Sequence, residues 1–330
     1  MALPEVAVPS AGRGPGRPAV VIGALSLLAL VVIACFMLLG AGGNWDFVLP
    51  FRATKLAGLV LVGYAIAVST VLFQTVTSNR ILTPALMGFD TLFILVQTAI
   101  VFFFTSAALA TVDARLQFMV EVAVMVGFSV LLFRWLFVDG GRSLHLLVLV
   151  GIVFGVFFRS LANLMQRMMD PNEFIVLQDS FFDSFNTIDR TLLGISTVIV
   201  ALASVALWRI WRSLDVLALG RAPAIGLGVA YRRVVMQALV IMAVLVAVST
   251  ALVGPITFFG LLVVSLAHAL AGDGRHRYIL PASILLAIIC LVGGQTLLER
   301  VFSFGTALSI IIEFLGGLVF IFLVLRGAAR

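Results

Sequence analysis

The sequence predicts an all-α polytopic membrane protein with about ten transmembrane helices. Of its 330 residues, 62% are hydrophobic and only 11% are charged. Soluble globular chains are roughly 45–50% apolar and about 25% charged, so this chain has too little charge to cover a surface facing water. A spanning helix needs about 20 largely apolar residues, and the hydropathy pattern divides this chain into ten apolar runs.

The first run follows a short polar tail. Residues 1–18 are rich in Pro and Gly and contain Arg13 and Arg17, which predicts a disordered cytoplasmic tail before a single transmembrane domain at 19–330. The apolar run at 19–40 is too long for the core of a signal peptide, and no clear A-x-A cleavage site follows it. We therefore predict that this run is the first membrane span.

The other nine spans are predicted from the remaining apolar runs. Thr83-Pro84 is a good start for the third, because a hydroxyl at the N-cap can accept a backbone N–H and proline fits the first helical position. Only Gly254-Pro255-Ile256 separates the seventh run from the eighth, so this pair is either a helical hairpin or a partly re-entrant segment. The nine runs lie at 53–73, 85–104, 115–133, 143–165, 191–210, 233–253, 257–271, 278–298 and 306–325.

The charge distribution predicts the orientation. With ten spans both termini share one side, and the loops opposite collect acidic residues. The positive-inside rule therefore places both termini in the cytoplasm. Fourteen of the 21 basic residues lie on the side of the termini: Arg13, Arg17, Arg80, Arg134, Arg142, Arg209, Arg212, Arg221, Arg232, Arg233, Arg275, Arg277, Arg326 and Arg330.

Two loops are long enough to have a role of their own. The outer loop, residues 166–190, alternates acidic residues with phenylalanines. The inner loop, residues 211–232, is amphipathic and contains Pro223, Gly226 and Gly228. This inner loop is interpreted either as short surface helices or as a plain connector lying on the membrane surface.

The sequence lacks the common signatures of catalysis. It contains no G-x-x-x-x-G-K-[ST], H-E-x-x-H or G-x-S-x-G motif, and its three histidines have no metal-ligand spacing. Cys35 and Cys290 each lie inside an apolar run, so no disulfide is expected. The basic residues sit singly at the ends of apolar runs, which fits membrane topology better than a nucleic-acid surface. We expect a transport protein, not an enzyme.

Four short stretches occur in a characteristic order and spacing between about residue 45 and the C-terminus. They resemble the motifs of the membrane permease subunit of bacterial iron–siderophore and vitamin B12 ABC importers, the FecCD-like family. The stretches are Leu49-Pro50-Phe51-Arg52-Ala53-Thr54-Lys55-Leu56, the run from Phe73 to Gly88, Leu217-Ala218-Leu219-Gly220 with the following Gly226 and Arg232-Arg233, and Val253-Gly254-Pro255-Ile256-Thr257-Phe258-Phe259-Gly260-Leu261.

The chain also departs from the family pattern. The usual Pro-His after the fourth motif is Val264-Ser265, the inner-loop Glu aligns near Arg221, and Ser303-Phe304-Gly305 replaces Glu-Leu-Pro before the last span. The residues around Arg80 to Asp90 are similar to a subgroup that serves siderophores, often catecholates, and not vitamin B12.

The resemblance implies a vitamin-B12-importer-like (type II ABC importer) architecture in the bacterial inner membrane. The chain would pair with a second permease subunit, identical or paralogous, and bind two ABC ATPase subunits that hold ATP and Mg. A periplasmic or lipid-anchored siderophore-binding protein would deliver ferric siderophore for passage from the periplasm to the cytoplasm. No nucleic acid partner is expected, and this chain itself would bind no cofactor or metal.

The resemblance also implies two docking regions. In the family the inner loop forms coupling helices that contact the ATPase. On the outer side, Arg52, Lys55 and Arg300 occupy positions where the family offers cations to acidic lobes of the binding protein. The alternative is that these long basic side chains only anchor the interface. The coupling residues predicted here are Leu219, Gly220, Arg221, Ala222, Ala224 and Gly226.

One stripe of small and polar residues marks the fifth span: Gly151, Gly155, Arg159 and Asn163 recur every four residues, with Gln166 three further on. The stripe either packs closely against a neighbouring helix or lines the substrate path. In the second case Arg159, nearer the outer interface than the midplane, would face an anionic ferric catecholate.

Three further acidic residues lie within or near spans. Asp90 would favour the positive N-terminus of its helix. For Glu121 and Glu313 a hydrogen bond inside the protein is the preferred interpretation.

Two other classes of function are alternatives to an ATP-driven importer. An ion-coupled secondary transporter of a small solute needs no ATPase and often shows inverted repeats, which this sequence does not show. A membrane-embedded enzyme would need spaced histidine ligands or paired acids in mid-span, and these are missing.

Overall fold

The computed structural model describes residues 17–40, 45–109, 112–137, 144–181, 185 and 188–301, together with nine residues between 308 and 321. The predicted N-terminal tail therefore lies almost wholly outside the described residues, and so does Glu313. The described residues near the C-terminus are helical where the tenth span is predicted.

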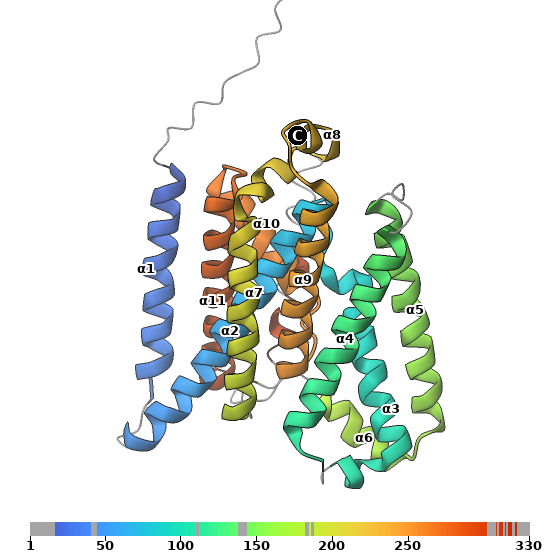
Figure 1. Cartoon of the computed structure of the whole chain (residues 1–330). Helices are drawn as coiled ribbons and strands as arrows, with labels where there is room; N and C mark the ends of the chain where they lie inside the picture. The colour runs from blue at the N-terminus through green and yellow to red at the C-terminus, as the bar shows by residue number, and fades with distance from the viewer. Residues whose placement is uncertain are drawn as a thin grey trace, which may run out of the picture.

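The described part of the chain is all α-helical, as the sequence predicts (Figure 1). Within the described ranges, seven helices are long and apolar enough to cross a membrane, and α3 and α10 are shorter apolar helices. The helices are α1 (Arg17–Leu38), α2 (Trp45–Thr77), α3 (Phe89–Leu109), α4 (Ala114–Phe137), α5 (Leu144–Met168), α6 (Pro171–Ser180), α7 (Arg190–Leu217), α8 (Arg221–Gly226), α9 (Tyr231–Val253), α10 (Phe259–Ala271) and α11 (His276–Arg300).

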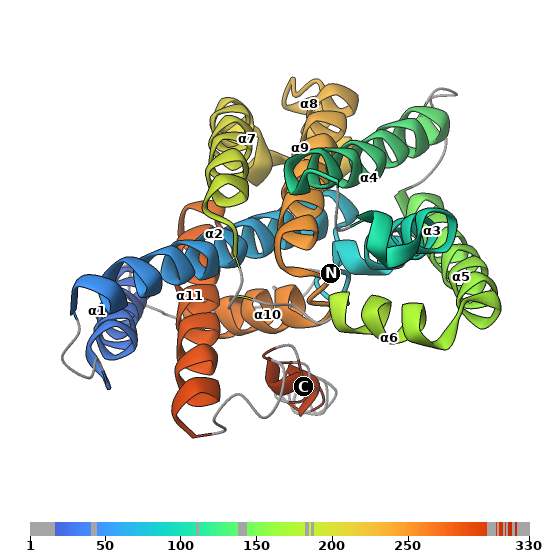
Figure 2. The ribbon, with the colours of Figure 1, turned by 90° about the horizontal axis from the view of Figure 1, so that it is seen from below.

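Helices α2 and α9 form the centre of the bundle. They are the most buried of the long helices, and they pack against each other. Helix α2 also packs on α11, and α9 packs on α7 and α4 (Figure 2). Helices α1 and α7 lie at the periphery and are the least buried of the long helices, as expected of helices that face lipid. Helix α2 is longer than predicted, about 50 Å at 1.5 Å per residue, so it extends beyond or tilts within a 30 Å hydrocarbon layer.

The predicted third span, 85–104, is broken near its start. Pro84–Met87 form a 3₁₀ turn, η1, and Gly88 at φ +84° redirects the chain into α3. Proline does occupy the first position of the turn, but the Thr83 hydroxyl makes no capping hydrogen bond, so that part of the prediction was wrong. The turn packs against α5 at Gly151 and Gly155, where the missing side chains let two backbones approach.

Helices α9 and α10 are not a packed hairpin. Gly254 at φ +90° ends α9, and α10 turns away to pack against α11 and α2. At 13 residues α10 is about 20 Å long, too short to cross the hydrocarbon layer by itself. Its Gly260 lies so close to α2 that an added Cβ would overlap the Thr70 hydroxyl, which explains the glycine at this position.

The close contact between η1 and α5 gives a stability prediction. In Gly88→Ala, the new Cβ would lie 2.9 Å from Cα of Gly155, and alanine would be strained at φ +84°. We expect the free energy of unfolding to fall by roughly 1–3 kcal/mol, which would be measured as a lower melting temperature of the purified protein. Gly127→Ala is the control, because α4 has open space there and alanine favours helix. Equal melting temperatures for the two variants would contradict the tight contact.

Candidate functional site

A short helix protrudes at one end of the bundle, called here the α8 end (Figure 1). Helix α7 stops at Leu217, and Gly220 at φ +96° starts the six-residue α8. Three apolar side chains around α8 are largely exposed: Leu219 by 61%, Ile225 by 52% and Leu227 by 65%. The sequence therefore folds here into a short surface helix with an uncovered apolar face.

The predicted coupling residues differ in exposure. Arg221, Ala222 and Gly226 are exposed, and Gly220 is half-buried. Ala224 is fully buried, and its carbonyl accepts the backbone N–H of Val229 at 3.0 Å. Ala224 therefore packs α8 against the rest of the protein. The exposed face of the loop is formed by the neighbouring Arg221, Ala222 and Gly226.

A polar relay beneath α8 joins three helices. His276, the first residue of α11, has Nδ1 2.7 Å from Asp215 Oδ1 and Nε2 2.7 Å from the Thr75 hydroxyl. Asp215 Oδ1 also accepts the backbone N–H of His276 at 2.9 Å. Since Asp215 lies in the last turn of α7, just before α8, the relay ties the end of α7 to α2 and α11. This relay is not among the predicted sites, and its local signal in the sequence is the acidic Asp215 within the inner loop.

At the opposite end, Arg52 binds within this chain. Its guanidinium donates hydrogen bonds to four carbonyl oxygens at the C-terminal end of α1: Phe36 (3.1 Å), Met37 (2.8 Å), Leu39 (2.8 Å) and Gly40 (3.2 Å). Carbonyls at a helix end have no partner in their own helix, and a cation there also complements the helix dipole. Arg52 is 8% exposed, so in the single chain it acts as a cap for α1.

Lys55 is likewise buried and forms an ion pair. Its Nζ lies 2.7 Å from Glu299 Oε1, with side-chain exposures of 5% and 11%. The same Glu299 oxygen accepts the Gln295 side-chain amide at 2.8 Å. Arg300, beside this pair, is exposed and donates to the Leu39 carbonyl. Of the three cations predicted for docking, only Arg300 is presented on the surface of the single chain.

The stripe on α5 divides into two parts. Gly151 and Gly155 pack against η1, as the close-packing alternative requires. Arg159 and Asn163 are exposed. Gln166 donates to the Thr98 hydroxyl on α3 at 3.0 Å. Only Arg159 and Asn163 are therefore free to face a path outside the single chain.

The intramembrane acidic residues have polar surroundings. The side-chain amides of Gln97 and Gln117 both donate to Glu121 Oε1, at 2.8 and 2.9 Å, which confirms the predicted internal hydrogen bonding. Asp90, in the first turn of α3, is buried and lines a cavity of about 30 Å³ together with hydroxyl residues such as Thr83 and Thr250. Among the described residues, no three His, Cys, Asp or Glu side chains lie close enough to hold a metal ion.

Two aspartates organise the loop at the α6 end. Asp170 accepts the backbone N–H of Asn172 at 2.8 Å and starts α6. Asp189 starts α7 by accepting the N–H groups of Thr191 and Leu192, and these donors lower the pKa of its carboxyl group. The predicted outer loop thus contains a surface helix between two capped ends.

Comparison with known proteins adds to this geometry. The model of the FecCD transport family matches residues 19–326. The petrobactin import system permease protein YclO of Bacillus subtilis is 48% identical over 299 residues, covering 91% of this chain and 95% of that protein. The petrobactin import system permease protein FatC of Bacillus anthracis is 35% identical, covering 84% and 78%. The ferric enterobactin permease protein FepD of Escherichia coli is 29% identical, covering 92% and 90%.

The fold also matches a solved structure. An inward-facing conformation of a metal-chelate type ABC transporter superposes with a TM-score of 0.81 at 23% identity, covering 94% of this chain and 99% of that one. At this identity the match supports the fold alone.

Variants of the ion pair between Lys55 and Glu299 can separate a role of Lys55 in stability from a role in docking. In Lys55→Met the buried carboxylate of Glu299 keeps its desolvation cost but loses the cation that offsets it. We therefore expect the free energy of unfolding to fall by about 3–5 kcal/mol. The double variant Lys55→Met/Glu299→Leu removes both charges, and its melting temperature should return close to that of the wild type. Thermal unfolding of the purified proteins measures both effects.

The same double variant tests binding-protein docking. If Lys55 acts only through Glu299, the double variant keeps wild-type affinity for the binding protein. A stable double variant with weakened binding would instead show that Lys55 contacts that partner.

Proposed function

The chain belongs to the FecCD transport family, and from this we propose that it is the transmembrane permease subunit of an ATP-driven importer of ferric siderophores. Transport would run from the periplasmic side of the bacterial inner membrane to the cytoplasm. The observation that carries the proposal is the 48% identity, over nearly the full length of both chains, to a petrobactin import permease. A second petrobactin permease is 35% identical, so ferric petrobactin is the substrate we propose.

The proposed assembly places the α8 end in the cytoplasm, together with both termini. The positive-inside count of the sequence supports this orientation. Two permease subunits, identical or paralogous, would enclose one central path. ATP and Mg would be held by two ABC ATPase subunits and not by this chain, and a siderophore-binding protein would dock at the α6 end.

Coupling to the ATPases is assigned to α8 and its flanking residues. A soluble partner is expected to cover exposed apolar side chains, and Leu219, Ile225 and Leu227 offer such a surface. The Thr75–His276–Asp215 relay supports the proposal, because it gives movement of the coupling loop a hydrogen-bonded connection to α2 and α11. Coupled elements need such contiguous contacts.

The substrate path is assigned to the exposed outer half of the α5 stripe. Arg159 lies nine residues before the end of α5, or about 14 Å along the helix. An exposed arginine at this depth is costly against lipid. The cost falls if Arg159 faces a hydrated path between two permease subunits, where it would meet an anionic iron chelate.

Uptake of radioactive iron as ferric petrobactin tests the function. Vesicles with the reconstituted permease, ATPase and binding protein should take up iron when ATP is supplied on the ATPase side. A Walker lysine substitution in the ATPase should abolish uptake. Uptake that persists in this variant and follows an ion gradient would favour the secondary-transporter alternative.

Leu227→Asp tests the docking surface. A buried, solvent-excluded carboxylate at the interface should weaken ATPase assembly by tenfold or more, since an uncompensated buried charge costs several kcal/mol. Ile175→Asp is the control, because Ile175 is similarly exposed, at 59%, on α6 at the other end of the bundle. Copurification of the ATPase with each variant provides the measurement. Equal ATPase recovery from both variants would argue against docking at α8.

Arg159→Ala tests the path. We expect iron uptake to fall roughly tenfold or more at unchanged melting temperature, because one charge contact to an anionic chelate is lost. Arg167→Ala is the matched control: Arg167 is also an exposed arginine of α5, but it lies in the last turn. Wild-type uptake by Arg159→Ala would remove this residue from the path.

A further inference from the structure

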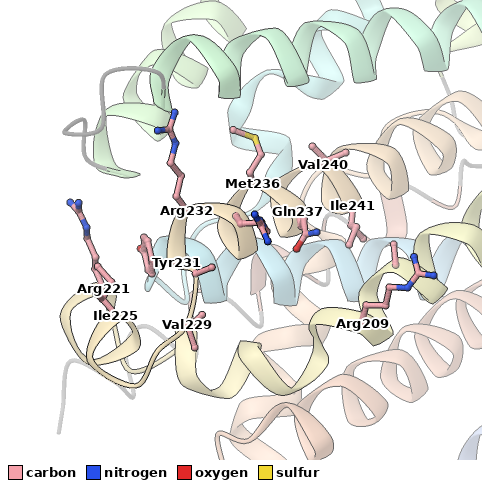
Figure 3. A pocket seen from close by; sticks show the side chains of 13 residues that line it. Arg209, Arg221, Ile225, Val229, Tyr231, Arg232, Met236, Gln237, Val240 and Ile241 are labelled. Carbon is pink, nitrogen blue, oxygen red and sulfur yellow. The ribbon is translucent and has the colours of Figure 1, made fainter.

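A basic groove of about 990 Å³ lies between α7, α8 and α9 near the α8 end. Helix α7 contributes Ala206 and Arg209 to its wall, and α8 contributes Arg221 and Ile225 (Figure 3). The floor comes from α9 and the residues before it. The floor residues are Val229, Ala230, Tyr231, Arg232, Arg233, Met236, Gln237, Val240 and Ile241.

The charge in the groove has one sign. Its lining includes Arg209, Arg221, Arg232 and Arg233 and contains no acidic residue. All four arginines are exposed. The positive charge of this lining, taken over the described residues, is therefore complementary to an anion.

Arginines lie at the mouth of the groove and at Arg209 on α7, and apolar side chains of α9 line the stretch between them. Arg232 and Arg233 lie in the first turn of α9, whereas Val240 and Ile241 lie two turns deeper, about 12 Å along the helix. Figure 3 shows Met236 and Val240 between Arg232 and Arg209. An occupant therefore needs a charged head and an apolar body.

The groove continues onto a surface suited to lipid. Val198, Leu202, Val205 and Arg209 recur at helical spacing on one side of α7, and the three apolar members are 52–66% exposed. The adjacent Trp208 is 79% exposed, and tryptophan is enriched where a helix crosses the membrane interface. The wall of the groove at Arg209 thus adjoins a lipid-facing stripe.

We propose that this groove binds a phospholipid with an anionic headgroup in the inner leaflet of the membrane. The phosphate and headgroup sit among the arginines, and the acyl chains run along Met236, Val240 and Ile241 into the bilayer. Basic pockets between transmembrane helices on the cytoplasmic side are suited to anionic lipid headgroups. The bound lipid fills the space between α7, α8 and α9 and so supports the position of the coupling helix.

A protein partner fits this groove less well. Leu219 and Leu227, the most exposed apolar residues around α8, do not line it. Arg209 lies eight residues before the end of α7, about 12 Å along the helix. A soluble subunit resting on α8 would have to reach into the membrane to contact Arg209, whereas a lipid is already there.

Native mass spectrometry of the full-length chain tests the proposal. The delipidated protein is titrated with phosphatidylglycerol or with phosphatidylcholine of identical acyl chains. The wild type should bind phosphatidylglycerol more tightly. Arg209→Gln/Arg233→Gln should lose roughly 30-fold in affinity for it, and the control Arg212→Gln/Arg277→Gln should keep wild-type affinity. The control removes two exposed arginines near the same end that do not line the groove.

Three results would overturn the proposal. The first is equal binding of the two lipids by the wild type. The second is an equal loss in the groove and control variants. The third is displacement of phosphatidylglycerol by excess inorganic phosphate alone, which would identify a free-anion site.

ATPase copurification, measured in parallel, separates this proposal from the proposed function. Groove variants that keep phosphatidylglycerol but lose the ATPase would reassign the groove to ATPase docking, against the lipid proposal. Selective lipid binding by a wild-type chain that recruits no ATPase would support the lipid site and contradict the proposed importer.

Discussion

The structure depends on one constraint: within the hydrocarbon layer, polar groups must find their partners inside the protein. The chain meets this constraint with its own side chains. Arg52 caps the carbonyls that end α1, Lys55 is paired with Glu299, and two glutamine side chains donate to Glu121. The contacts of Arg52, of Lys55 and of Gln97 with Glu121 each join two different helices, so the few charged residues help to fix how the helices pack.

The same constraint explains where the backbone is irregular. The 3₁₀ turn η1 interrupts the third predicted span, and α10 is too short to cross the hydrocarbon layer by itself. Irregular backbone is tolerated at membrane depth only when protein covers it. Gly151 and Gly155 let η1 lie directly on α5, and Gly260 does the same for α10 on α2. Gly151, Gly155 and Gly260 therefore mark close contacts between elements, and two residues of the predicted path serve this packing.

The two ends of the bundle differ in a way that suits an importer. At the α6 end, two of the three cations predicted to dock a partner, Arg52 and Lys55, are buried within the chain. At the α8 end, apolar side chains and arginines remain exposed, and Asp215 in the last turn of α7 belongs to a relay that reaches α2 and α11. Coupling to an energy source and interaction with lipid are therefore both proposed at the α8 end.

The sequence by itself determined the membrane class, the approximate spans and the family, because hydropathy, charge bias and motif order are local properties of the chain. Tertiary structure decided the partners of the polar groups. Lys55 and Glu299 are 244 positions apart, and Thr75 and His276 are 201 apart, so no local pattern connects them. The basic groove likewise exists only because α7, α8 and α9 meet. Hydrophobic periodicity shows that a residue lies in a helix, but only the packing of helices decides which side chain it touches.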